Sequence, residues 1–475
     1  MVGRSPLARL GRSISRDFCI WWRQLRVGLG SGQTRPGLYE YRFSEHGGQT
    51  RLHLRIGPDG AGLLFVDVSE VIHLNPMAAE ITRMLLDGVR PRRIVALLQS
   101  WYPEAPPADV QADVAQLAEA VELLKDPAAP CAACALGFDR TEPFATRARA
   151  PYKADLALTY ACQNNCAHCY NEPGRKQMAS LETRDWRRVL KRLADIGVPH
   201  IIFTGGEPTL ADGLPELVRC AEDLGEVTGI NTNGRRLAEP HLAPRLKAAG
   251  LDHVQITLAS HLPEVHNATV AAAAFDETVA GIRHCLQADL HTITNTTLTR
   301  ENSDHALEIV EFLDDLGLQT FAMNGMICAG GGRHSPQSLS ERELIPVLTA
   351  VRDRAVELGM RFLWYTPTEY CRLSPVELGL GVKSCNAAEY SICVEPNGDV
   401  LPCQSFYSPV GNLLKDDWSS IWNSELFVKL RTRRECPAEA GLPESCRDCP
   451  DLQVCGGGCP LQRAERYQEV LVHES

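Results

Sequence analysis

The sequence has no excess of positive charge: 48 Lys and Arg residues stand against 59 Asp and Glu residues, for a formal net charge of −11. Phosphate binding needs a basic face, so we expect no nucleic-acid partner. The sequence also lacks an apolar run long enough for a transmembrane segment, and it shows no cleavable signal peptide. The 18 cysteines therefore indicate a reducing, cytoplasmic environment and metal ligation rather than disulfides.

The length of 475 residues exceeds that of one ordinary domain, and the hydrophobic content of 44% is ample for buried cores. Pattern and composition divide the chain into a basic N-terminal segment, a small mixed module, a linker rich in Ala, Pro and Arg, a region of alternating strands and helices, and a cysteine-rich C-terminal part. These span 1–36, 37–127, 128–152, 153–369 and 370–475. The basic segment either lies on a membrane or partner surface or is a poorly ordered terminus.

The region 153–369 is predicted to form an α/β fold of repeated strand–helix units. Strands alternating with amphipathic helices are typical of a parallel sheet, and six units suit a partial (β/α)6 TIM barrel, whose chemistry lies at the carboxyl ends of the strands. The expected strands are 156–160, 200–204, 227–232, 253–258, 292–298 and 320–327, and the expected helices lie near 181–196, 214–224, 239–249, 275–288, 304–316 and 340–358.

Three cysteines follow the first of these strands with the spacing C-x3-C-x2-C, at Cys162, Cys166 and Cys169. One short loop can bring three thiolates to one metal centre. Three protein ligands leave a coordination position open, which is typical of a catalytic site, whereas structural zinc and electron-carrying clusters normally take four. The alternative for the triplet alone is a zinc site or incidental cysteines.

The second strand runs into Gly205, Gly206, Glu207 and Pro208. The glycines allow the backbone to approach a ligand closely, and the proline stiffens the exit from the loop. Together, the two motifs resemble the radical S-adenosylmethionine (radical SAM) superfamily. The resemblance implies a 4Fe–4S cluster held by the three cysteines, with its fourth iron chelated by the methionine part of SAM, and a Gly-Gly-Glu-Pro loop that contacts the SAM amino group.

The resemblance implies further SAM contacts at the other strand ends, from Asn233 in the polar turn 231–234, Thr257, Ser260 and Asn295. The family often has Ser-Leu-Asp-Gly where this chain has Thr-Leu-Ala-Ser, so the usual acid is missing. Asn302 is a second candidate for the ribose, and His266 falls where peptide-modifying relatives often carry a histidine. A structural loop asparagine and a surface histidine are the respective alternatives. The run Gly330-Gly331-Gly332-Arg333 is a candidate pocket lining.

The C-terminal part contains Cys385, Gly398 and Cys403, followed by Cys446, Cys449, Cys455 and Cys459 with the spacing C-x2-C-x5-C-x3-C. These two sets resemble the first and second halves of the SPASM domain pattern. The resemblance implies two auxiliary 4Fe–4S clusters, with Cys459 serving the cluster opposite to its three neighbours. Two fully ligated 4Fe–4S clusters need eight thiolates, and these cysteines supply six. The further cysteine that the family usually has does not follow Cys459. Our first choice for one missing ligand is Cys436, and Cys371 or Cys393 for the other. The alternatives are an open iron and a zinc ribbon.

The module 37–127 is predicted to contain three strands followed by three helices, in a winged-helix-like arrangement. The run VIHLNPMAAEITRMLLDG at 71–88 resembles the PqqD-like leader-recognition domains. These bind the leader of a ribosomal precursor peptide by adding it as a strand to a sheet edge. A generic wing domain used for dimerisation is the alternative. Cys131 and Cys134, in the linker, are taken as incidental.

The combined resemblance is to radical SAM/SPASM maturases of ribosomal peptides. It implies that an electron donor such as flavodoxin or ferredoxin reduces the cluster, that SAM is cleaved to a 5′-deoxyadenosyl radical, and that a precursor peptide is oxidatively modified by a cross-link, a thioether or an excision. One alternative is a sulfatase-maturase-like enzyme acting on a protein substrate. The other is a non-catalytic iron–sulfur or zinc adaptor, for which a SAM loop has no use. No catalytic residue is assigned from the sequence.

Overall fold

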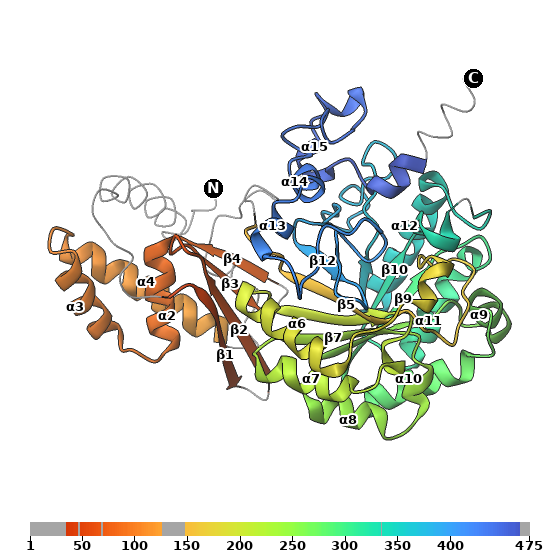
Figure 1. Ribbon diagram of the computed structural model, residues 1–475, viewed down its shortest axis with the longest axis horizontal. Coiled ribbons are helices and arrows are strands. Elements are labelled where there is room, and N and C mark those ends of the chain that lie inside the picture. The colour runs from red at the N-terminus through yellow and green to blue at the C-terminus, as the bar shows by residue number, and fades with distance from the viewer. Residues whose placement is uncertain (1–34, 46–47, 68–69, 126–147, 334, 466–475) are drawn as a thin grey trace. The chain divides into compact units, whose positions relative to one another are not determined.

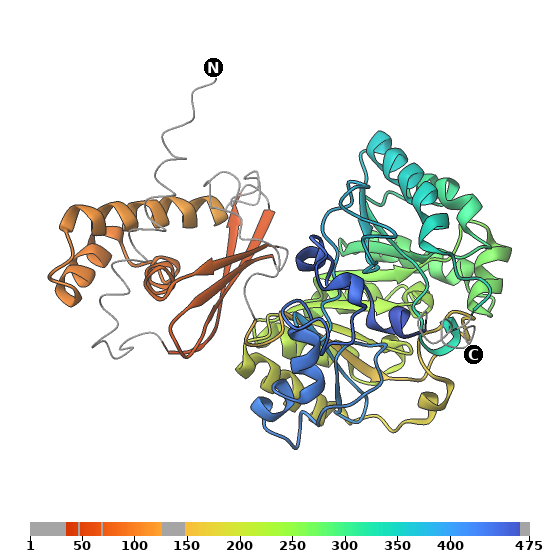
Figure 2. The same ribbon diagram turned by 90° about the horizontal axis from the view of Figure 1, so that it is seen from above.

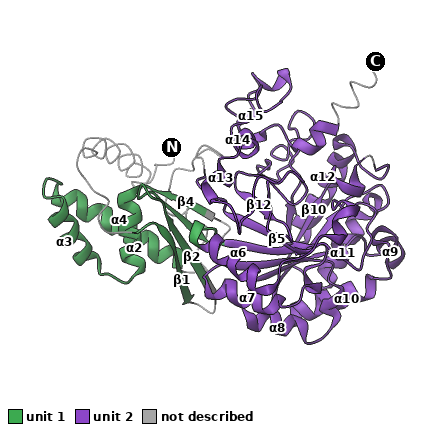
Figure 3. Cartoon of the chain, in the orientation of Figure 1, with its two compact units in different colours: residues 1–142, 195–199 green, residues 143–194, 200–475 purple. Residues whose placement is uncertain are grey.

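The computed structural model describes residues 35–45, 48–67, 70–125, 148–333 and 335–465. Most of the basic segment 1–36, as well as Cys131 and Cys134, lies outside the described residues. The chain forms two compact units, one of residues 1–142 and 195–199 and the other of residues 143–194 and 200–475 (Figure 3). In the part of the chain that the structure describes, no helix combines the length and the apolar character needed to cross a bilayer.

The first unit contains an antiparallel four-stranded sheet in the order β1-β2-β3-β4. Its strands are β1 (Gly37–Glu45), β2 (Gly48–Ile56), β3 (Gly62–Val66) and β4 (Glu70–Leu74), and its helices are α2 (Pro76–Leu86), α3 (Pro91–Trp101) and α4 (Pro107–Lys125). The sequence predicted three strands followed by three helices. The structure adds a fourth strand, because Glu70–Leu74 pairs with β3 immediately before α2 begins.

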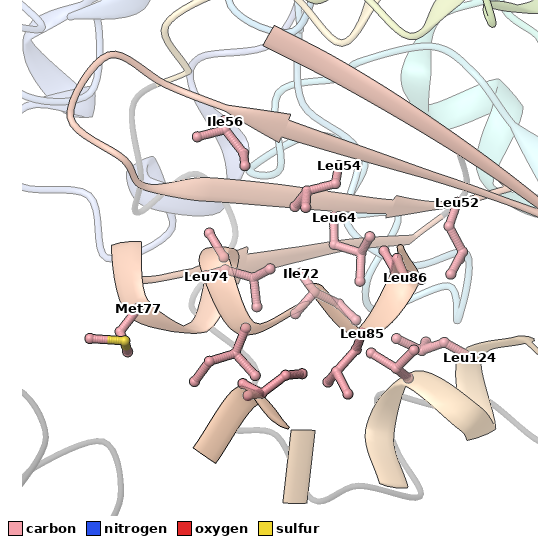
Figure 4. Packing of buried hydrophobic residues seen from close by; sticks show 14 of the residues in the cluster. Leu52, Leu54, Ile56, Leu64, Ile72, Leu74, Met77, Leu85, Leu86 and Leu124 are labelled. Atoms are coloured by element: carbon pink, nitrogen blue, oxygen red, sulfur yellow. The ribbon is translucent and has the colours of Figure 1, made fainter. Parts of the chain in front are cut away.

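One apolar core holds this unit together (Figure 4). Leu54 and Leu64 on the strands face Leu85 on α2 and Leu124 on α4, and all four are buried. The start of α2 follows from its sequence, because the Asn75 side chain accepts a hydrogen bond from the N–H of Ala78 at 2.8 Å and a proline occupies the first helical position.

The second unit contains a nine-stranded sheet in the order β11-β10-β9-β8-β7-β6-β5-β12-β13. The six predicted strands form its centre and are all parallel: β5 (Lys153–Thr159), β6 (His200–Gly205), β7 (Val227–Thr232), β8 (His253–Thr257), β9 (His291–Thr297) and β10 (Thr320–Asn324). The sequence did not predict that β11 (Arg361–Trp364) would pair with β10, or that β12 (Ser391–Val394) would pair with β5. β13 (Val400–Leu401) pairs antiparallel with β12.

Helices between the strands bury one apolar face each. In α6, the buried Trp186, Val189, Leu190 and Leu193 recur at helical spacing. The helices are α6 (Thr183–Ile196), α7 (Leu214–Asp223), α8 (Leu242–Ala249), α9 (Pro263–Val270), α10 (Phe275–Gln287), α11 (Ala306–Asp315) and α12 (Glu341–Leu358), of which only α9 was not expected. Figure 2 shows α11 and α12 from above.

Beyond β13, the described residues up to 465 form only short α-helices. They include α13 (Trp418–Trp422), α14 (Glu425–Arg431) and α15 (Leu452–Cys455). Short 3-10 helices occur in the loops of this unit, at η1 (Pro173–Gln177), η2 (Pro208–Leu210), η3 (Arg235–Ala238), η4 (Ser303–His305), η5 (Gly330–Gly332) and η6 (Glu444–Cys446). Within the unit, this cysteine-rich segment lies on the side of the sheet away from α7, α8 and α10 (Figure 1).

Candidate metal and cofactor site

The parallel register places the predicted motifs at one edge of the large sheet. Thr159 at the end of β5 lies opposite Gly205 at the end of β6, and Thr257 at the end of β8 lies opposite Asn295 in β9. The cysteine loop, the Gly-Gly-Glu-Pro loop and the polar turn after β7 all leave the sheet at this carboxyl edge. This is where ligands bind in parallel α/β sheets.

The two glycines let the end of β6 lie directly against the start of the cysteine loop. The N–H of Gly206 donates to the carbonyl of Thr159 at 2.7 Å, and the N–H of Glu207 donates to that of Ala161 at 2.9 Å. A Cβ at Gly205 would overlap the carbonyl of Thr159, and one at Gly206 would overlap that of Ala161. Gly205 also has a φ of 133°, which side chains disfavour.

Glu207 is fully buried and connects neighbouring strand ends. Its Oε1 accepts hydrogen bonds from the N–H and hydroxyl of Thr209 at 3.0 and 2.6 Å and from the hydroxyl of Thr232 at 2.7 Å, while Oε2 accepts from the N–H of Asn233 at 2.8 Å. Burial raises the pKa of Glu207, and these hydrogen bonds oppose that shift. Four donors directed at its oxygens require an acceptor, so the carboxylate holds the loops in place.

Asn233 and Arg235, in the turn after β7, contact the cysteine loop directly. The amide of Asn233 lies 3.8 Å from Cys162 Sγ. The guanidinium of Arg235 donates to the carbonyl of Gln163 at 3.2 Å and to Asn164 Oδ1 at 3.0 Å. Sequence reasoning did not identify Arg235, although its position two residues after Asn233 in a polar turn was the available signal.

The glycine run after β10 contacts the backbone of the cysteine loop. The N–H of Gly331 donates to the carbonyl of Cys169 at 2.7 Å. A Cβ at Gly330 would lie 2.5 Å from that same carbonyl oxygen, and one at Gly331 would lie 2.5 Å from the carbonyl oxygen of Ala167. The run therefore packs against the backbone of the loop, which the sequence pattern alone did not indicate.

The three thiols suit a cationic metal centre chemically. Burial raises the pKa of Cys162, Cys166 and Cys169, and for Cys166 the neighbouring thiols add to the effect and the pKa reaches about 12. Metal ligation favours the thiolate form. Among the described residues, no three His, Cys, Asp or Glu side chains are close enough to hold a single metal ion. Each iron of a cluster takes its own thiolate, so a cluster accepts wider spacing than one ion.

The remaining predicted SAM contacts differ in whether their side-chain polar atoms already have hydrogen-bond partners in the protein. The hydroxyl of Ser260 is buried and accepts from the N–H of Leu262 at 3.1 Å. Asn302 is buried and bonds Ala259, Thr297 and Thr299 at 2.8–2.9 Å, as a structural asparagine does. Asn295 Oδ1, by contrast, is buried and has no hydrogen-bond partner within the described part of the chain, so it remains available to a ligand.

His266 and Thr257 complete this set. His266 is buried rather than at the surface, and its Nδ1 accepts from the N–H of Ala259 at 3.2 Å. Its pKa falls to about 4 because burial penalises the charged ring. Thr257 is half-buried at the end of β8, beside Asn295.

The C-terminal cysteines fall into two groups, which we define by the thiols that influence one another electrostatically. In the first group, burial raises the pKa of Cys403 to about 12 and that of Cys459 to about 11, and in each case the Cys385 thiol is the next cause. In the second, burial raises the pKa of Cys446, followed by the effects of Cys455, Cys449 and Cys371. We call these the Cys385 group and the Cys446 group.

A buried set of charges supports both groups. The Glu389 carboxylate pairs with Arg433 at 2.9 Å and with Arg434 at 3.0 Å, and all three side chains are almost inaccessible to solvent. Arg433 also donates to the carbonyls of Cys385 and Gly456, while Arg434 donates to that of Gln453. The two arginines thus connect both cysteine groups.

Aromatic residues join the C-terminal part to the cysteine loop. The hydroxyl of Tyr160 donates to Glu395 at 2.8 Å, and Arg175 pairs with the same carboxylate. Tyr170, which follows Cys169, donates from its hydroxyl to Gln404, which follows Cys403, at 3.2 Å. The loop is thereby tied to the Cys385 group.

Comparison with protein-family models matches three families along the chain. Residues 156–313 match the radical SAM superfamily, 385–450 match the SPASM iron–sulfur cluster-binding domain, and 61–122 match coenzyme PQQ synthesis protein D. The site and fold therefore define a radical SAM protein with a SPASM domain and a PqqD-like module.

Curated relatives and solved structures agree with this class. The PqqA peptide cyclase of Xanthomonas euvesicatoria is 30% identical over 334 residues, covering 66% of this chain and 83% of the relative, and that of Streptomyces rochei is 30% identical over 324 residues, covering 66% and 85%. This chain belongs to the radical SAM family that includes these cyclases.

The fold is shared with Streptococcus suis SuiB bound to the precursor peptide SuiA, at a TM-score of 0.64 and 16% identity over 89% of this chain and 96% of SuiB. It is also shared with anSMEcpe bound to AdoMet, at a TM-score of 0.52 and 17% identity over 66% and 90% of the two chains.

Proposed function

We propose that this chain is a radical SAM enzyme that oxidatively modifies a ribosomally synthesised precursor peptide. The observation that carries the proposal is the direct contact of the cysteine loop with the Gly-Gly-Glu-Pro strand end, in a chain that also has a PqqD-like module. The names of the curated relatives, which act on a peptide, support the substrate class. A cross-link, a thioether or an excision would each suit this chemistry.

In this proposal, Cys162, Cys166 and Cys169 hold a 4Fe–4S cluster, and the strand ends at Gly205–Pro208, Asn233, Thr257, Ser260 and Asn295 surround SAM. When bound, the cluster and SAM together supply an electron and a 5′-deoxyadenosyl radical that abstracts hydrogen from the substrate. The protein supplies placement. Glu207 fixes the turn that carries Asn233, Arg235 fixes the cysteine loop, and the unpartnered Oδ1 of Asn295 can accept a hydrogen bond from a SAM hydroxyl.

The two C-terminal cysteine groups would hold two auxiliary 4Fe–4S clusters. One of them would accept the electron left on the product radical or bind a substrate thiolate. An electron donor such as flavodoxin or ferredoxin would reduce the SAM cluster. The described cysteines are all free thiols, which supports a cytoplasmic location.

The PqqD-like module would bind the leader of the precursor at an edge of its sheet. The strand order leaves β1 and β4 at the edges, and an exposed strand edge can pair with an extended peptide. This binding would provide affinity away from the chemistry. The rival function, maturation of a folded protein, has no need of such a module.

Reductive cleavage of SAM tests the enzyme assignment. We expect the anaerobically reconstituted wild type to form 5′-deoxyadenosine with a reductant, and the triple variant Cys162→Ala, Cys166→Ala, Cys169→Ala to form none while retaining its auxiliary iron. Cys220→Ala, in α7 and outside the three groups, is the matched control. Deoxyadenosine from the triple variant would refute the assignment, and an adaptor would produce none in any variant.

Peptide binding tests the substrate assignment. Short reading frames beside the gene supply candidate precursors, and their affinity can be measured with the full chain and with a chain lacking residues 1–127. We expect weaker binding without the module, while SAM cleavage in the absence of peptide continues. Equal affinity of the two chains would favour the dimerisation role or a protein substrate.

A further inference from the structure

The Cys446 group contains a thiol that the C-x2-C-x5-C pattern does not include. That pattern contributes Cys446, Cys449 and Cys455, whereas a 4Fe–4S cluster used for electron transfer normally takes four cysteines. The geometry points to Cys371 as the fourth thiolate ligand of the cluster that these three cysteines hold. The inference rests on the proposed function, which supplies the cluster.

The segment immediately before Cys371 lies against Cys455. The backbone N–H of Tyr370 donates to Cys455 Sγ at 3.5 Å, and the Cys455 thiol lies 3.8 Å from the carbonyl oxygen of Thr368. Thr368 is 1% exposed and Cys455 is 8% exposed, so this contact is part of the interior. Cys371 therefore directly follows Tyr370, whose backbone N–H contacts the Cys455 thiol of the Cys446 group.

Small residues allow this close approach. A Cβ at Gly458 would lie 3.0 Å from the backbone nitrogen of Glu369, and Gly458 has a φ of 66°. The hydroxyl of Ser384 donates to the carbonyl of Cys455 at 3.0 Å and holds the same turn from another side. The turn that carries Cys455 is thus fixed against the segment 368–370.

The four thiols differ in how far each is exposed to solvent. Cys371 is exposed, whereas Cys446 and Cys449 are half-buried and Cys455 is buried. Cys371 thus lies at the surface, one residue beyond the backbone contact with the buried Cys455.

The other two unassigned cysteines have different surroundings. The N–H of Cys436 donates to the carbonyl of Thr432 at 2.7 Å, and its own carbonyl accepts from Ala440 at 3.1 Å, so its backbone belongs to the turn after α14. Cys393 is 1% exposed and packs in an apolar cluster with Tyr160 and Leu401. Neither arrangement resembles the contact between Tyr370 and Cys455.

The test uses the full chain with Cys162, Cys166 and Cys169 replaced by Ala, so that only auxiliary iron is seen. Cys371→Ala and the matched control Cys220→Ala are compared in this background by iron analysis, Mössbauer and EPR spectroscopy. We expect Cys371→Ala to lower iron from about eight to about four atoms per chain, or to change the spectrum of one cluster, and Cys220→Ala to change neither. Cys371→Ser should restore iron with an altered spectrum.

Thiol labelling of the unmodified protein gives a second, independent readout should Cys371→Ala fail to fold. Because Cys371 is exposed, we expect maleimide to label it after the iron is chelated but not in the loaded protein, while Cys220 is labelled equally in both. Equal labelling of Cys371 in both states, or an unchanged spectrum in Cys371→Ala, overturns the inference alone. Absence of auxiliary iron in the parent chain overturns both the inference and the auxiliary clusters of the proposed function.

Discussion

The carboxylate of Glu207 accepts a hydrogen bond from the backbone N–H of Asn233 at 2.8 Å, which joins the end of β6 to the end of β7 beside the cysteine loop. The side chain of the same Asn233 reaches Cys162 Sγ at 3.8 Å. The acid of the Gly-Gly-Glu-Pro motif thus acts on the cysteine loop through Asn233, because both of its oxygens are occupied by donors of the chain itself.

Glu207→Gln should disturb this arrangement without changing side-chain size. The NH2 group of the new glutamine would face backbone N–H and hydroxyl groups that donate to the carboxylate in the wild type. We therefore expect the free energy of unfolding to fall by about 1–3 kcal/mol and SAM to bind more weakly. Urea denaturation and calorimetric SAM titration measure the two effects. Glu239→Gln, at an exposed acid, is the control. Unchanged SAM affinity in Glu207→Gln would show that the turn is held by other contacts.

Gly206→Ala should separate the strand end from the cysteine loop. The added methyl group overlaps the carbonyls of Tyr160 and Ala161, which are backbone atoms with little freedom to move. We expect a destabilisation of about 1–3 kcal/mol and reduced iron on the SAM cluster. Gly174→Ala, where no atom lies within 4 Å of the added methyl group, should leave both unchanged. Full iron content and stability in Gly206→Ala would contradict the tight contact.

Arg235→Met keeps the apolar stem but removes the donors to Gln163 and Asn164. Charge-assisted hydrogen bonds contribute about 1.5–3 kcal/mol, so we expect the cysteine loop to loosen and iron to pass to a chelator about tenfold faster or more. Absorbance of the released iron follows this rate. Arg245→Met, at an exposed position on α8, is the control. Equal release rates would show that Arg235 does not position the loop.

Mild acid should destabilise the fold through the half-buried His253 and the buried His266. Burial lowers the pKa of His253 and of His266 to about 4, against an ordinary value of 6.5. A lowered folded-state pKa means that the unfolded chain takes up the proton first. Their contribution is therefore complete above pH 6.5 and is lost progressively as pH falls towards 4. We expect each histidine to lower the free energy of unfolding by about 1 kcal/mol at pH 5.5 relative to pH 7.5.

Urea denaturation of the apo-protein at the two pH values checks this expectation. His266→Gln should reduce the difference between the two pH values, since it removes one of the titrating groups. His241→Gln, at an exposed histidine, should leave the difference unchanged. A pH dependence in His266→Gln equal to that of the wild type would mean that His266 is not the source.

Glu389→Gln should strongly destabilise the C-terminal part. It leaves the buried guanidiniums of Arg433 and Arg434 without their counter-charge, and breaking one partner of a buried pair costs about 3–5 kcal/mol. Chemical denaturation measures the loss, and Glu439→Gln at an exposed acid is the control. A loss below about 1 kcal/mol would show that water or relaxation compensates for the missing charge.

The sequence was sufficient for the features that depend on local spacing. The cysteine triplet, the glycine pair and the six central strands each follow from residues close together in the chain, because ligand spacing, backbone freedom and hydrophobic period are local properties. The sheet then places them together, since parallel strands bring their carboxyl ends to one edge. β11 has four residues, too few for a period to be read.

Tertiary structure alone decided the contacts between distant residues. Arg235 reaches Asn164 across 71 positions, and Tyr370 reaches Cys455 across 85. Sequence spacing favoured Cys436 over Cys371 and Cys393 as an additional ligand, whereas the folded chain places the segment before Cys371 against Cys455. Composition and spacing specify which chemical groups a chain has, whereas the folded backbone determines which of them meet, because that depends on the sum of all the contacts rather than on any single motif.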